Sequence, residues 1–393
     1  MSVTARQLPL KGIRVVDFSW VMAGPIATKM LGTMGAEVIK VESATRPEYT
    51  NRAGMFRVIN NNKLSCSINI ARPEGQELVR RLVGVSDVVV ENFSARVLSK
   101  YGLGYEDLRV LRPDIVFVSA SGVGRTGPQR DALAYGTLLQ AYSGRAGMIG
   151  AVNARLEAMG IQPAWTDPMT ALWEALAILA ALIHRRRTSL GAYVDLSMLE
   201  STVALLPEAL LRQQLGVSDV PPGGNREIGA APAGCFRCAG EDEWLALAVR
   251  SDRQWQDLCA TIGRRELAHD ARYADAALRE RHKRALDEMV ADWLRQRSAD
   301  QAEAALQASF IPAARARNYA ELIEDPHVCA RGLFPIVADG RRTVALPWMD
   351  ETGWRGSYAL PPSLGGDNDY VLGRLLGLDR AEIDRLVRDG VIQ

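Results

Sequence analysis

The chain has 393 residues, which exceeds one typical domain and makes two domains the default expectation. Apolar residues at 48% and charged residues at 24% are typical of a soluble globular protein. A net charge of +1 argues against a large nucleic-acid-binding surface and favours a small-molecule or protein partner.

Cysteine usage and hydropathy bear on where the protein works. The five cysteines are scattered and odd in number, which favours a reducing compartment over disulfide bonding. Cys235 and Cys238 form a single C-x-x-C without a second pair, so we expect a strand there and no metal or redox site. Residues 1–12 lack an apolar core of signal-peptide length, and the apolar run 169–183 is too short to span a bilayer and contains Glu174. The sequence therefore predicts a soluble, cytoplasmic protein with no membrane partner.

Strand and helix patterns alternate along the first part of the chain. Runs rich in β-branched residues predict buried strands at 13–18, 37–42, 65–70, 86–90, 114–120 and 193–198. Helical patterns lie between them, at 26–34, 73–84, 107–112 and 169–183. The alternation predicts an α/β protein with a doubly wound parallel sheet. Ligands bind beyond the carboxyl ends of strands in such sheets, so the loops 91–93 and 121–128 are candidate binding sites.

The second part of the chain has a different texture. A Pro- and Gly-rich break at 221–225 predicts a domain boundary. A strand at 244–249 and charged helices at 252–263, 275–296 and 299–308 follow. The stretch 371–391 predicts two helices around Gly377, with an apolar face that returns to the first domain. We expect a large Rossmann-like domain from 1–220, a small α+β domain from 226–325, and a returning segment from 326–393.

Asp167 lies at the start of the most apolar helical run. It precedes Pro168, and proline suits the first turn of a helix. The run ends at His184–Arg187, where cations suit the helix dipole. From this stretch alone, Asp167 is either a helix cap or a reactive carboxylate, and caps are commoner.

The glycine-rich loop also matches a nucleotide-binding pattern. Gly122, Gly124 and Gly127 spell G-x-G-x-x-G. Pro128 follows at once, and no acidic residue stands about twenty positions further on to hold a ribose. We therefore interpret the match as chance and reject a nicotinamide-dependent oxidoreductase.

Several separate motifs resemble those of the class III CoA-transferases, the family of formyl-CoA transferase and carnitine CoA-transferase. They are LKGIRVVDFSWVMAGPIATKMLGTMGAEVIKVE, NNNKLSCSINIARPEGQELVRRLVGVSDVVVENF, YGLGYEDL, VSASGVGRTGP, GAYVDLSMLE and LGLDRAEIDRLVRDGVIQ. They occur in the family's order and cover nearly the whole chain. The resemblance implies a large domain built from both chain ends, a small middle domain and two interlocked subunits, as a homodimer or as a heteromer with a homologous subunit.

The resemblance also implies the chemistry, because Asp167 falls where the family places its catalytic aspartate. It implies that CoA moves from an acyl-CoA donor to a carboxylic acid through a mixed anhydride and an aspartyl-CoA thioester. A carboxylate can do this with a CoA thioester as substrate and without a metal or permanent cofactor, since covalent catalysis divides one difficult transfer into easier steps. Gly223, Gly224 and Asn225 lie near the family's flexible active-site loop, or in an ordinary linker.

The resemblance also implies which residues contact CoA, one matching position at a time. The matching residues are Val21, Met22, Ala23, Asn92, Phe93, Lys100 and Tyr135. The first three are implied to lie beside the thioester and pantetheine arm, and Lys100 to face the CoA phosphates, unless it is a solvated lysine at a helix end. Met22 replaces a glutamine of formyl-CoA transferase. Ser43 replaces an arginine that stacks on adenine, and whether Arg46 substitutes for it stays open.

The substrates are less clearly indicated. Trp20, Met22, Tyr142 and Trp165 predict either an apolar pocket beside Asp167, for an acceptor larger than formate or oxalate, or ordinary core. The chain resembles the branch that uses succinyl-CoA and acts on aromatic or dicarboxylic acids such as benzylsuccinate.

Two other functions are compatible with the same fold. α-Methylacyl-CoA racemase resembles this chain but uses a histidine and a glutamate beside its aspartate. Residues 128–135 contain no histidine, and 250–252 contain no glutamate, so the two bases are missing. A non-catalytic CoA-binding partner subunit is the other alternative, and the presence of Asp167 argues against it.

Overall fold

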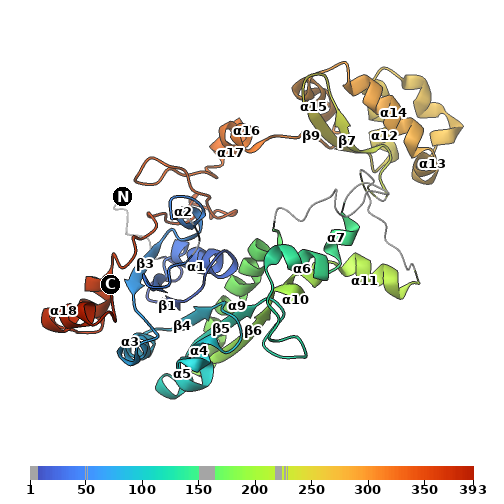
Figure 1. Cartoon of the computed structure of the whole chain (residues 1–393). Helices are drawn as coiled ribbons and strands as arrows, with labels where there is room; N and C mark the ends of the chain where they lie inside the picture. The colour runs from blue at the N-terminus through green and yellow to red at the C-terminus, as the bar shows by residue number, and fades with distance from the viewer. Residues whose placement is uncertain are drawn as a thin grey trace. The chain divides into compact units, whose positions relative to one another are not determined.

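The computed structural model describes residues 8–48, 50, 52–149, 164–216, 224, 227 and 229–393. The chain divides into two compact units (Figure 1). The first comprises Met1–Ala146, Gly160–Gly216 and His327–Gln393, so segments from both halves of the chain build it. The second comprises Gly147–Met159 and Val217–Pro326.

A six-stranded sheet in the order β3-β2-β1-β4-β5-β6 forms the centre of the first unit, and every neighbouring pair is parallel. The strands are β1 (Arg14–Asp17), β2 (Glu37–Glu42), β3 (Lys63–Ser67), β4 (Val88–Glu91), β5 (Val116–Ser121) and β6 (Ala192–Ser197). The predicted parallel α/β sheet is confirmed, and each predicted strand is present with ends that differ by at most three residues.

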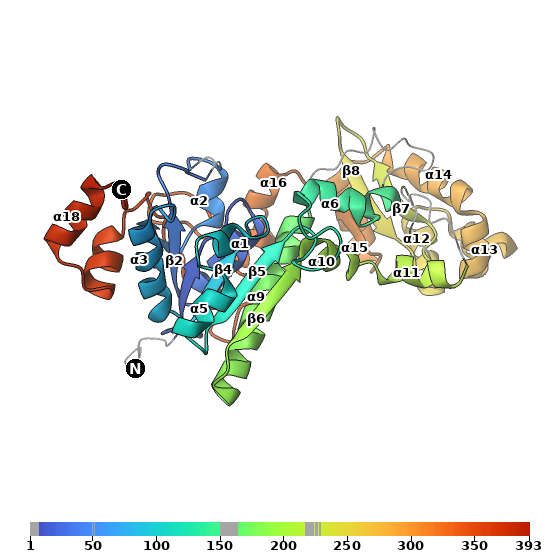
Figure 2. The ribbon, with the colours of Figure 1, turned by 60° about the horizontal axis from the view of Figure 1, so that its bottom comes forward.

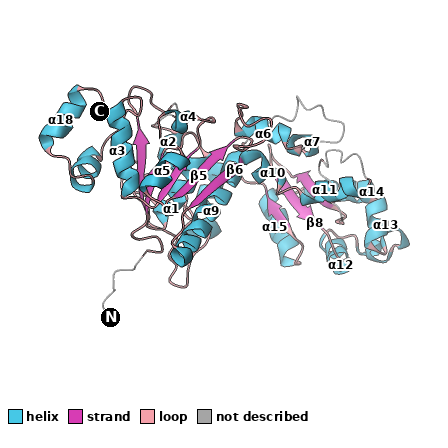
Figure 3. Cartoon of the chain, turned by 90° about the horizontal axis from the view of Figure 1, so that it is seen from below, coloured by secondary structure: helices cyan, strands magenta, loops and turns pink. Residues whose placement is uncertain are grey.

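Helices cover both faces of this sheet (Figure 3). One face buries Val16, Ile39, Val89 and Phe117 against residues of α3 (Pro73–Gly84) and α5 (Tyr105–Leu111). The other buries Val15, Val38, Val88 and Val116 against residues of α1 (Ala23–Thr33) and α9 (Thr166–Thr188). Burial on both faces explains why the strands are continuous β-branched runs in the sequence and do not alternate with polar residues.

The helix α9 is longer than the sequence predicts. Its 23 residues make it long and apolar enough to cross a membrane by length and composition, so the expected shortness of this run was wrong. The arginines 185–187 continue the helix beyond the apolar run, as cations near a C-terminus favour. Ala171, Ala175 and Ile178 are buried, and the helix packs on α1 and the sheet, which is the position of a core helix.

The last part of the chain lies beside the first. A π-helix (Asp369–Leu375) and α18 (Arg380–Arg388) flank Gly377, whose φ of 73° is left-handed, and the predicted helical pair is confirmed. Leu372 and Ile383 belong to the same core as α3. Figure 2 shows α18, in red, next to α3.

The second unit has its own sheet and core. The antiparallel strands are β7 (Ala233–Arg237), β8 (Trp244–Ala248) and β9 (Ala313–Arg315). The helices are α12 (Asp252–Thr261), α13 (Ala276–Arg281), α14 (Lys283–Leu294) and α15 (Ala299–Ala308). The predicted helix 275–296 is two helices because the chain turns at His282 between α13 and α14. Cys235 lies in β7, whereas Cys238 follows its end.

Short helices connect the larger elements of the first unit. They are α2 (Met55–Ile59), α4 (Val97–Lys100), α6 (Gly136–Tyr142), α10 (Met198–Val203) and α11 (Pro207–Gln214). The helices α7 (Arg145–Met148) and α17 (Pro326–Ala330) each span a point at which the chain passes from one unit to the other. The helix α16 (Tyr319–Glu324) and two 3-10 turns, Arg265–His269 and Ala271–Tyr273, belong to the second unit.

Candidate active site

A cavity of about 160 Å³ lies beyond the carboxyl ends of β1, β4 and β5 in the first unit. Six of the residues singled out from the sequence line it: Val21, Ala23, Asn92, Phe93, Tyr135 and Asp167. They come from the loops after β1 and β4, from the start of α1, from the residue before α6 and from the first turn of α9. A parallel sheet brings such loops to one edge, and this is where α/β proteins bind ligands.

Asp167 is not the cap of α9. The helix begins after Trp165, and no side-chain hydrogen bond caps it. Burial raises the pKa of Asp167 to about 6, and the residue's own backbone N–H offsets part of that rise. No cation contributes to its pKa within the described part of the chain. At neutral pH the cavity therefore holds a largely ionised carboxylate.

Gly136, at the start of α6, makes room for this carboxylate. A Cβ added at Gly136 would lie 1.7 Å from Asp167 Oδ2 and 2.7 Å from its Cγ. Any side chain at position 136 would displace the Asp167 carboxylate. Sequence reasoning missed this residue, because a single glycine after Tyr135 carries no motif of its own.

The side-chain amide of Asn92 is hydrogen-bonded to the loop after β1. Its Oδ1 accepts from the Trp20 N–H at 2.7 Å, and its Nδ2 donates to the Trp20 carbonyl at 2.8 Å. Phe93 packs edge-on against the Trp20 ring, with centroids 5.4 Å apart. Asn92 and Phe93 thus join the loops after β1 and β4 at the wall of the cavity.

Arg125 brings a buried cation to the same cavity. Its Nη2 lies 2.7 Å from Glu91 Oε1 and donates to the Phe93 carbonyl at 2.9 Å, while its Nε donates to Ser119 Oγ at 2.6 Å. Burial raises the pKa of Glu91, and the Arg125 charge opposes that rise. Arg125 and the exposed Arg130 also line an adjoining hollow of about 850 Å³. Sequence reasoning placed the glycine-rich loop at the site but missed these two arginines.

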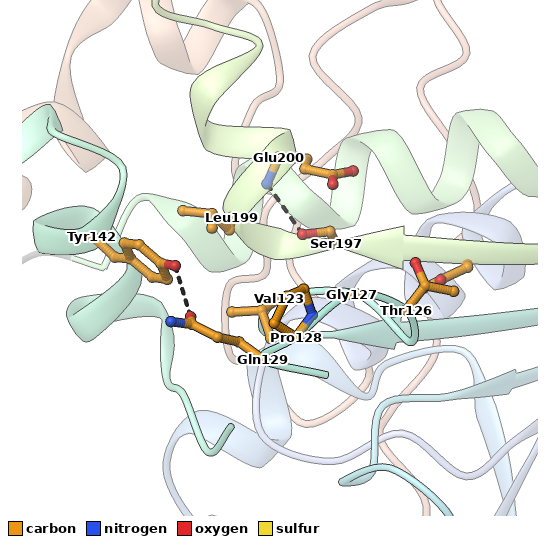
Figure 4. A pocket seen from close by; sticks show the side chains of 11 residues that line it. Val123, Thr126, Gly127, Pro128, Gln129, Tyr142, Ser197, Leu199 and Glu200 are labelled. Atoms are coloured by element: carbon orange, nitrogen blue, oxygen red, sulfur yellow. Dashed lines mark hydrogen bonds between the residues drawn. The ribbon is translucent and has the colours of Figure 1, made fainter. Parts of the chain in front are cut away.

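A third hollow, of about 430 Å³, is bounded by the glycine-rich loop and the start of α10 (Figure 4). In it, Tyr142 donates to Gln129 Oε1 at 2.7 Å, and the Glu200 N–H donates to Ser197 Oγ at 3.2 Å. Gly124 and Gly127 adopt backbone conformations with positive φ, of 89° and 79°, which glycine tolerates because it has no Cβ.

The apolar pocket expected from four large residues is not at Asp167. Tyr142 lines the hollow of Figure 4, and Trp165 lines a separate cavity with Met169 and Leu206. Trp20 lies against Phe93, and Met22 is the residue before α1. Among the described residues that line the Asp167 cavity, the large apolar side chains are instead Phe93, Leu133, Tyr135 and Met198. The correction arises because Trp165 is half-exposed before α9 and Tyr142 faces Gln129.

Two further predicted contacts lie away from this wall. Lys100 ends α4 and is exposed, with its Nζ 5.8 Å from the ring centroid of Tyr101. Met22 stands between two lining residues without lining the cavity itself. Of the predicted active-site loop, Gly223 and Asn225 fall outside the described residues, and Gly224 is an exposed, left-handed residue of the second unit.

Comparison with known proteins decides the family. A family model described as CoA-transferase family III matches residues 10–368. The chain belongs to this family. The motifs that suggested the class III CoA-transferases are therefore confirmed, and the protein is an enzyme of that class.

Two curated relatives extend over nearly the whole of this CoA-transferase. Succinyl-CoA–D-citramalate CoA-transferase of Chloroflexus aurantiacus is 31% identical and covers 98% of this chain and 98% of its own length. Succinate–glutarate CoA-transferase of Agrobacterium fabrum is 34% identical and covers 95% of this chain and 98% of its own. A crystal structure of a CAIB/BAIF family protein from Brucella suis has a TM-score of 0.85 at 29% identity, covering 94% of this chain and all of that one.

Proposed function

We propose that Asp167 is the nucleophile of this CoA-transferase. The observation that carries the proposal is a partly buried carboxylate that lines a cavity and whose pKa no cation lowers among the described residues. An unneutralised carboxylate is more nucleophilic than an ion-paired one, and carboxylates form covalent intermediates in several enzyme classes. Gly136 supports the role by leaving space for the carboxylate and none for a side chain.

The reaction proceeds by four acyl transfers. Asp167 Oδ attacks the donor thioester carbonyl and expels CoA thiolate, which leaves a mixed anhydride. The thiolate attacks the Asp167 carbonyl and expels the donor acid, which leaves an aspartyl-CoA thioester. The acceptor carboxylate then attacks the carbonyl of that thioester and expels CoA thiolate, which leaves a second mixed anhydride. Attack of the thiolate on the acceptor carbonyl releases the new acyl-CoA and restores the Asp167 carboxylate.

The substrates follow from the relatives and from the charge around the cavity. We propose succinyl-CoA as donor and a dicarboxylic acid as acceptor, because the two curated relatives are named for succinyl or succinate and for dicarboxylic acids. Arg125 and Arg130 line the cavity, and the buried Arg125 Nη1, which has no hydrogen-bond partner among the described residues, can donate to a second carboxylate. Val21, Ala23, Asn92, Phe93 and Tyr135 are the proposed walls for the thioester end of CoA. Met22 and Lys100 are proposed contacts farther along it.

A single variant tests the nucleophile. Asp167→Asn should lower transfer at least about 10³-fold, the scale on which loss of a covalent nucleophile acts, while the folded protein is retained. Wild type incubated with succinyl-CoA should gain the mass of CoA less one water, and Asp167→Asn should not. Transfer retained in Asp167→Asn would refute the proposal. A panel of dicarboxylic acids that includes glutarate, citramalate and benzylsuccinate then identifies the acceptor by mass spectrometry.

Isotope exchange separates the transferase from a racemase of the same fold. None of the described residues lining the Asp167 cavity is a histidine or a glutamate, the residue types expected for α-proton exchange. A 2-methylacyl-CoA in deuterated water should therefore gain no α-deuterium above background. Rapid incorporation would favour the racemase.

We further propose that two copies assemble as an interlocked dimer. The helix α9 exposes Leu172, Trp173, Leu176 and Ile183, and α11 exposes Leu210 and Leu211, so the first unit carries apolar surface for a partner. Linked chains cannot separate without unfolding. Sedimentation at nanomolar concentration should thus show dimers only, and a folded monomer that reassociates would exclude interlocking. Co-purification of a homologous chain would instead indicate a heteromer.

A further inference from the structure

The loop after β1 is held by side chains from other segments. The Ser19 carbonyl accepts from Lys40 Nζ at 2.6 Å, and the amide of Asn92 bonds both backbone groups of Trp20. The Val21 N–H donates to Glu48 Oε1 at 2.9 Å. The backbone of 19–21 lies outside any strand or helix, so these side chains satisfy the groups that a ladder would otherwise satisfy.

Val21 has an unfavourable backbone conformation. Its φ of 71° lies in the left-handed region, which β-branched residues avoid because their Cβ substituents crowd the backbone. Val21 and Ala23 line the Asp167 cavity, and α1 begins at Ala23 without a side-chain cap. If Val21 relaxed to a negative φ, the cavity wall and the first N–H groups of α1 would move together.

Glu48 is placed to prevent that relaxation. Its Oε2 lies 3.0 Å from Lys40 Nζ, and the two side chains are 3% and 0% exposed. Thr50 Oγ1 donates to the same Oε1 that accepts from Val21. A carboxylate is a stronger acceptor for an N–H than a neutral group, and Lys40 offsets the cost of burying it. Ionic groups buried in this way hold one conformation in some proteins.

We propose that Glu48 is a positioning residue that holds Val21 in its left-handed conformation and so fixes the cavity wall beside Asp167. Glu48 is absent from the described lining of that cavity, and it acts through Val21. The inference rests on the proposed role of the Asp167 cavity in CoA transfer. It concerns a contact within the chain and leaves the identity of the substrates open.

A double-mutant cycle tests the coupling. Glu48→Gln should lower kcat/KM about 10- to 100-fold, because displacements of about 1 Å near reacting groups have effects of that size. Glycine adopts positive φ without strain, so in a Val21→Gly background the same Glu48→Gln change should cost less than about 3-fold. Equal losses in the two backgrounds would overturn the proposal, since a general structural role of Glu48 does not depend on the residue at position 21.

A second measurement does not depend on activity. Amide hydrogen exchange of the peptide that contains 19–23 should be faster in Glu48→Gln than in wild type. Unchanged exchange there would also overturn the proposal. If Asp167→Asn retained transfer, the proposed function would fail while this exchange measurement still decided the role of Glu48.

Two further variants complete the design. Glu42→Gln is the matched control, because Glu42 is a buried carboxylate of β2 that bonds Arg52 and Ser65 and has no bond to 19–21 among the described residues. It should leave exchange of that peptide unchanged. If Glu48→Gln does not fold, Thr50→Val removes only the hydrogen bond that orients Glu48 and is measured in the same two backgrounds. Equal effects in both backgrounds would again refute the proposal.

Discussion

Asp17, which is fully buried, and Asp167, which is partly buried, are two aspartates of the first unit whose pKa values move in opposite directions. Burial opposes the ionisation of both, yet the pKa of Asp17 falls to about 2 whereas that of Asp167 rises to about 6. Lys63 Nζ lies 2.8 Å from Asp17 Oδ2, and Lys40 and Ser19 add to its stabilisation. Among the described residues, only the backbone N–H of Asp167 itself lowers the pKa of that carboxyl. The first unit thus pairs the buried carboxylate of Asp17 with a cation, whereas the carboxylate that lines the cavity has no ion pair among the described residues.

Glu174 marks the limit of that contrast. It lies on α9, seven residues after Asp167, and is fully buried. Both its carboxylate oxygens lack a hydrogen-bond partner among the residues that the structure describes. Burial raises its pKa to about 8, with further contributions from Asp17 and Glu91. Glu174 is therefore a neutral acid at pH 7. Being buried and unpaired does not by itself make a carboxylate reactive, and access to a cavity is the additional requirement.

The largest effect on stability is expected from breaking the Asp17 pair. Lys63→Met leaves the Asp17 carboxylate buried without its nearest cation, and such losses cost about 3–5 kcal/mol. Thermal and denaturant unfolding measure the change. Because the folded pKa of Asp17 is lowered, its stabilisation is present above its ordinary pKa of 3.8 and is lost as the pH falls toward 2. In Lys63→Met, the free energy of unfolding should not show this decrease between pH 3.8 and pH 2.

Lys29→Met is the matched control for Lys63→Met. Burial lowers the pKa of Lys29 to about 8, and its Nζ donates to a neutral acceptor, the Val58 carbonyl, at 2.8 Å. Removing this lysine leaves no buried carboxylate without its cation among the described residues. We therefore expect a much smaller loss of unfolding free energy. Similar losses for the two variants would mean that burial of the lysine stem, and not the ion pair, stabilises this region.

The second prediction concerns Glu174. The unfolded glutamate loses its proton near pH 4.5, whereas the folded one keeps it to about pH 8, so folding becomes less favourable as pH rises between these values. Glu174→Gln removes this penalty and should stabilise the protein by about 3 kcal/mol at pH 7. The stability of wild type should fall from pH 5 to pH 8 relative to the variant. Parallel curves would show that Glu174 is ionised in the folded protein.

The sheet could be predicted from the sequence because its strands carry a local signal. The β-branched runs around Val15, Val38, Val89 and Val116 are buried on both faces, and that burial makes each run continuous. Asp167 was singled out because it falls where the class III CoA-transferases are expected to have their catalytic aspartate, and its catalytic role stays a prediction. The boundaries were less accurate where tertiary contacts decide them, as at β3, which begins at Lys63 because that residue is the first to pair with β2, opposite Val38.

The interactions that define the cavity could not be predicted in the same way. Gly136 and Asp167 are 31 positions apart, and nothing in either local sequence indicates that a Cβ at 136 would meet a carboxylate oxygen. Asn92 appeared as a ligand contact, yet its amide bonds Trp20, which is 72 positions away. Motifs identify which residues matter, while the partner of each side chain depends on long-range packing.

The third prediction uses Gly136. Gly136→Ala places a methyl group where the Asp167 carboxylate lies, so that carboxylate must move by more than 1 Å. We expect kcat/KM to fall about 100-fold, the scale associated with such displacements. Gly147→Ala is the matched control, because Gly147 lies in α7 and a Cβ there meets no atom within 4 Å. An active Gly136→Ala enzyme would place the reacting carboxylate elsewhere.

The smallest effect is the pH dependence of the first transfer. Since the folded pKa of Asp167 is about 6, this proposed nucleophile is mostly protonated below that pH. The kcat/KM for the acyl-CoA should therefore fall about tenfold per pH unit below 6 and be constant above 7. A phosphate monoester on CoA titrates near the same pH, so binding alone could change there. The affinity of Asp167→Asn for CoA, measured over the same range, isolates that contribution. If kcat/KM still falls tenfold per pH unit after this correction, the titrating group is Asp167. If the corrected profile is flat, Asp167 stays ionised to below pH 5 and is paired with a cation in the working enzyme.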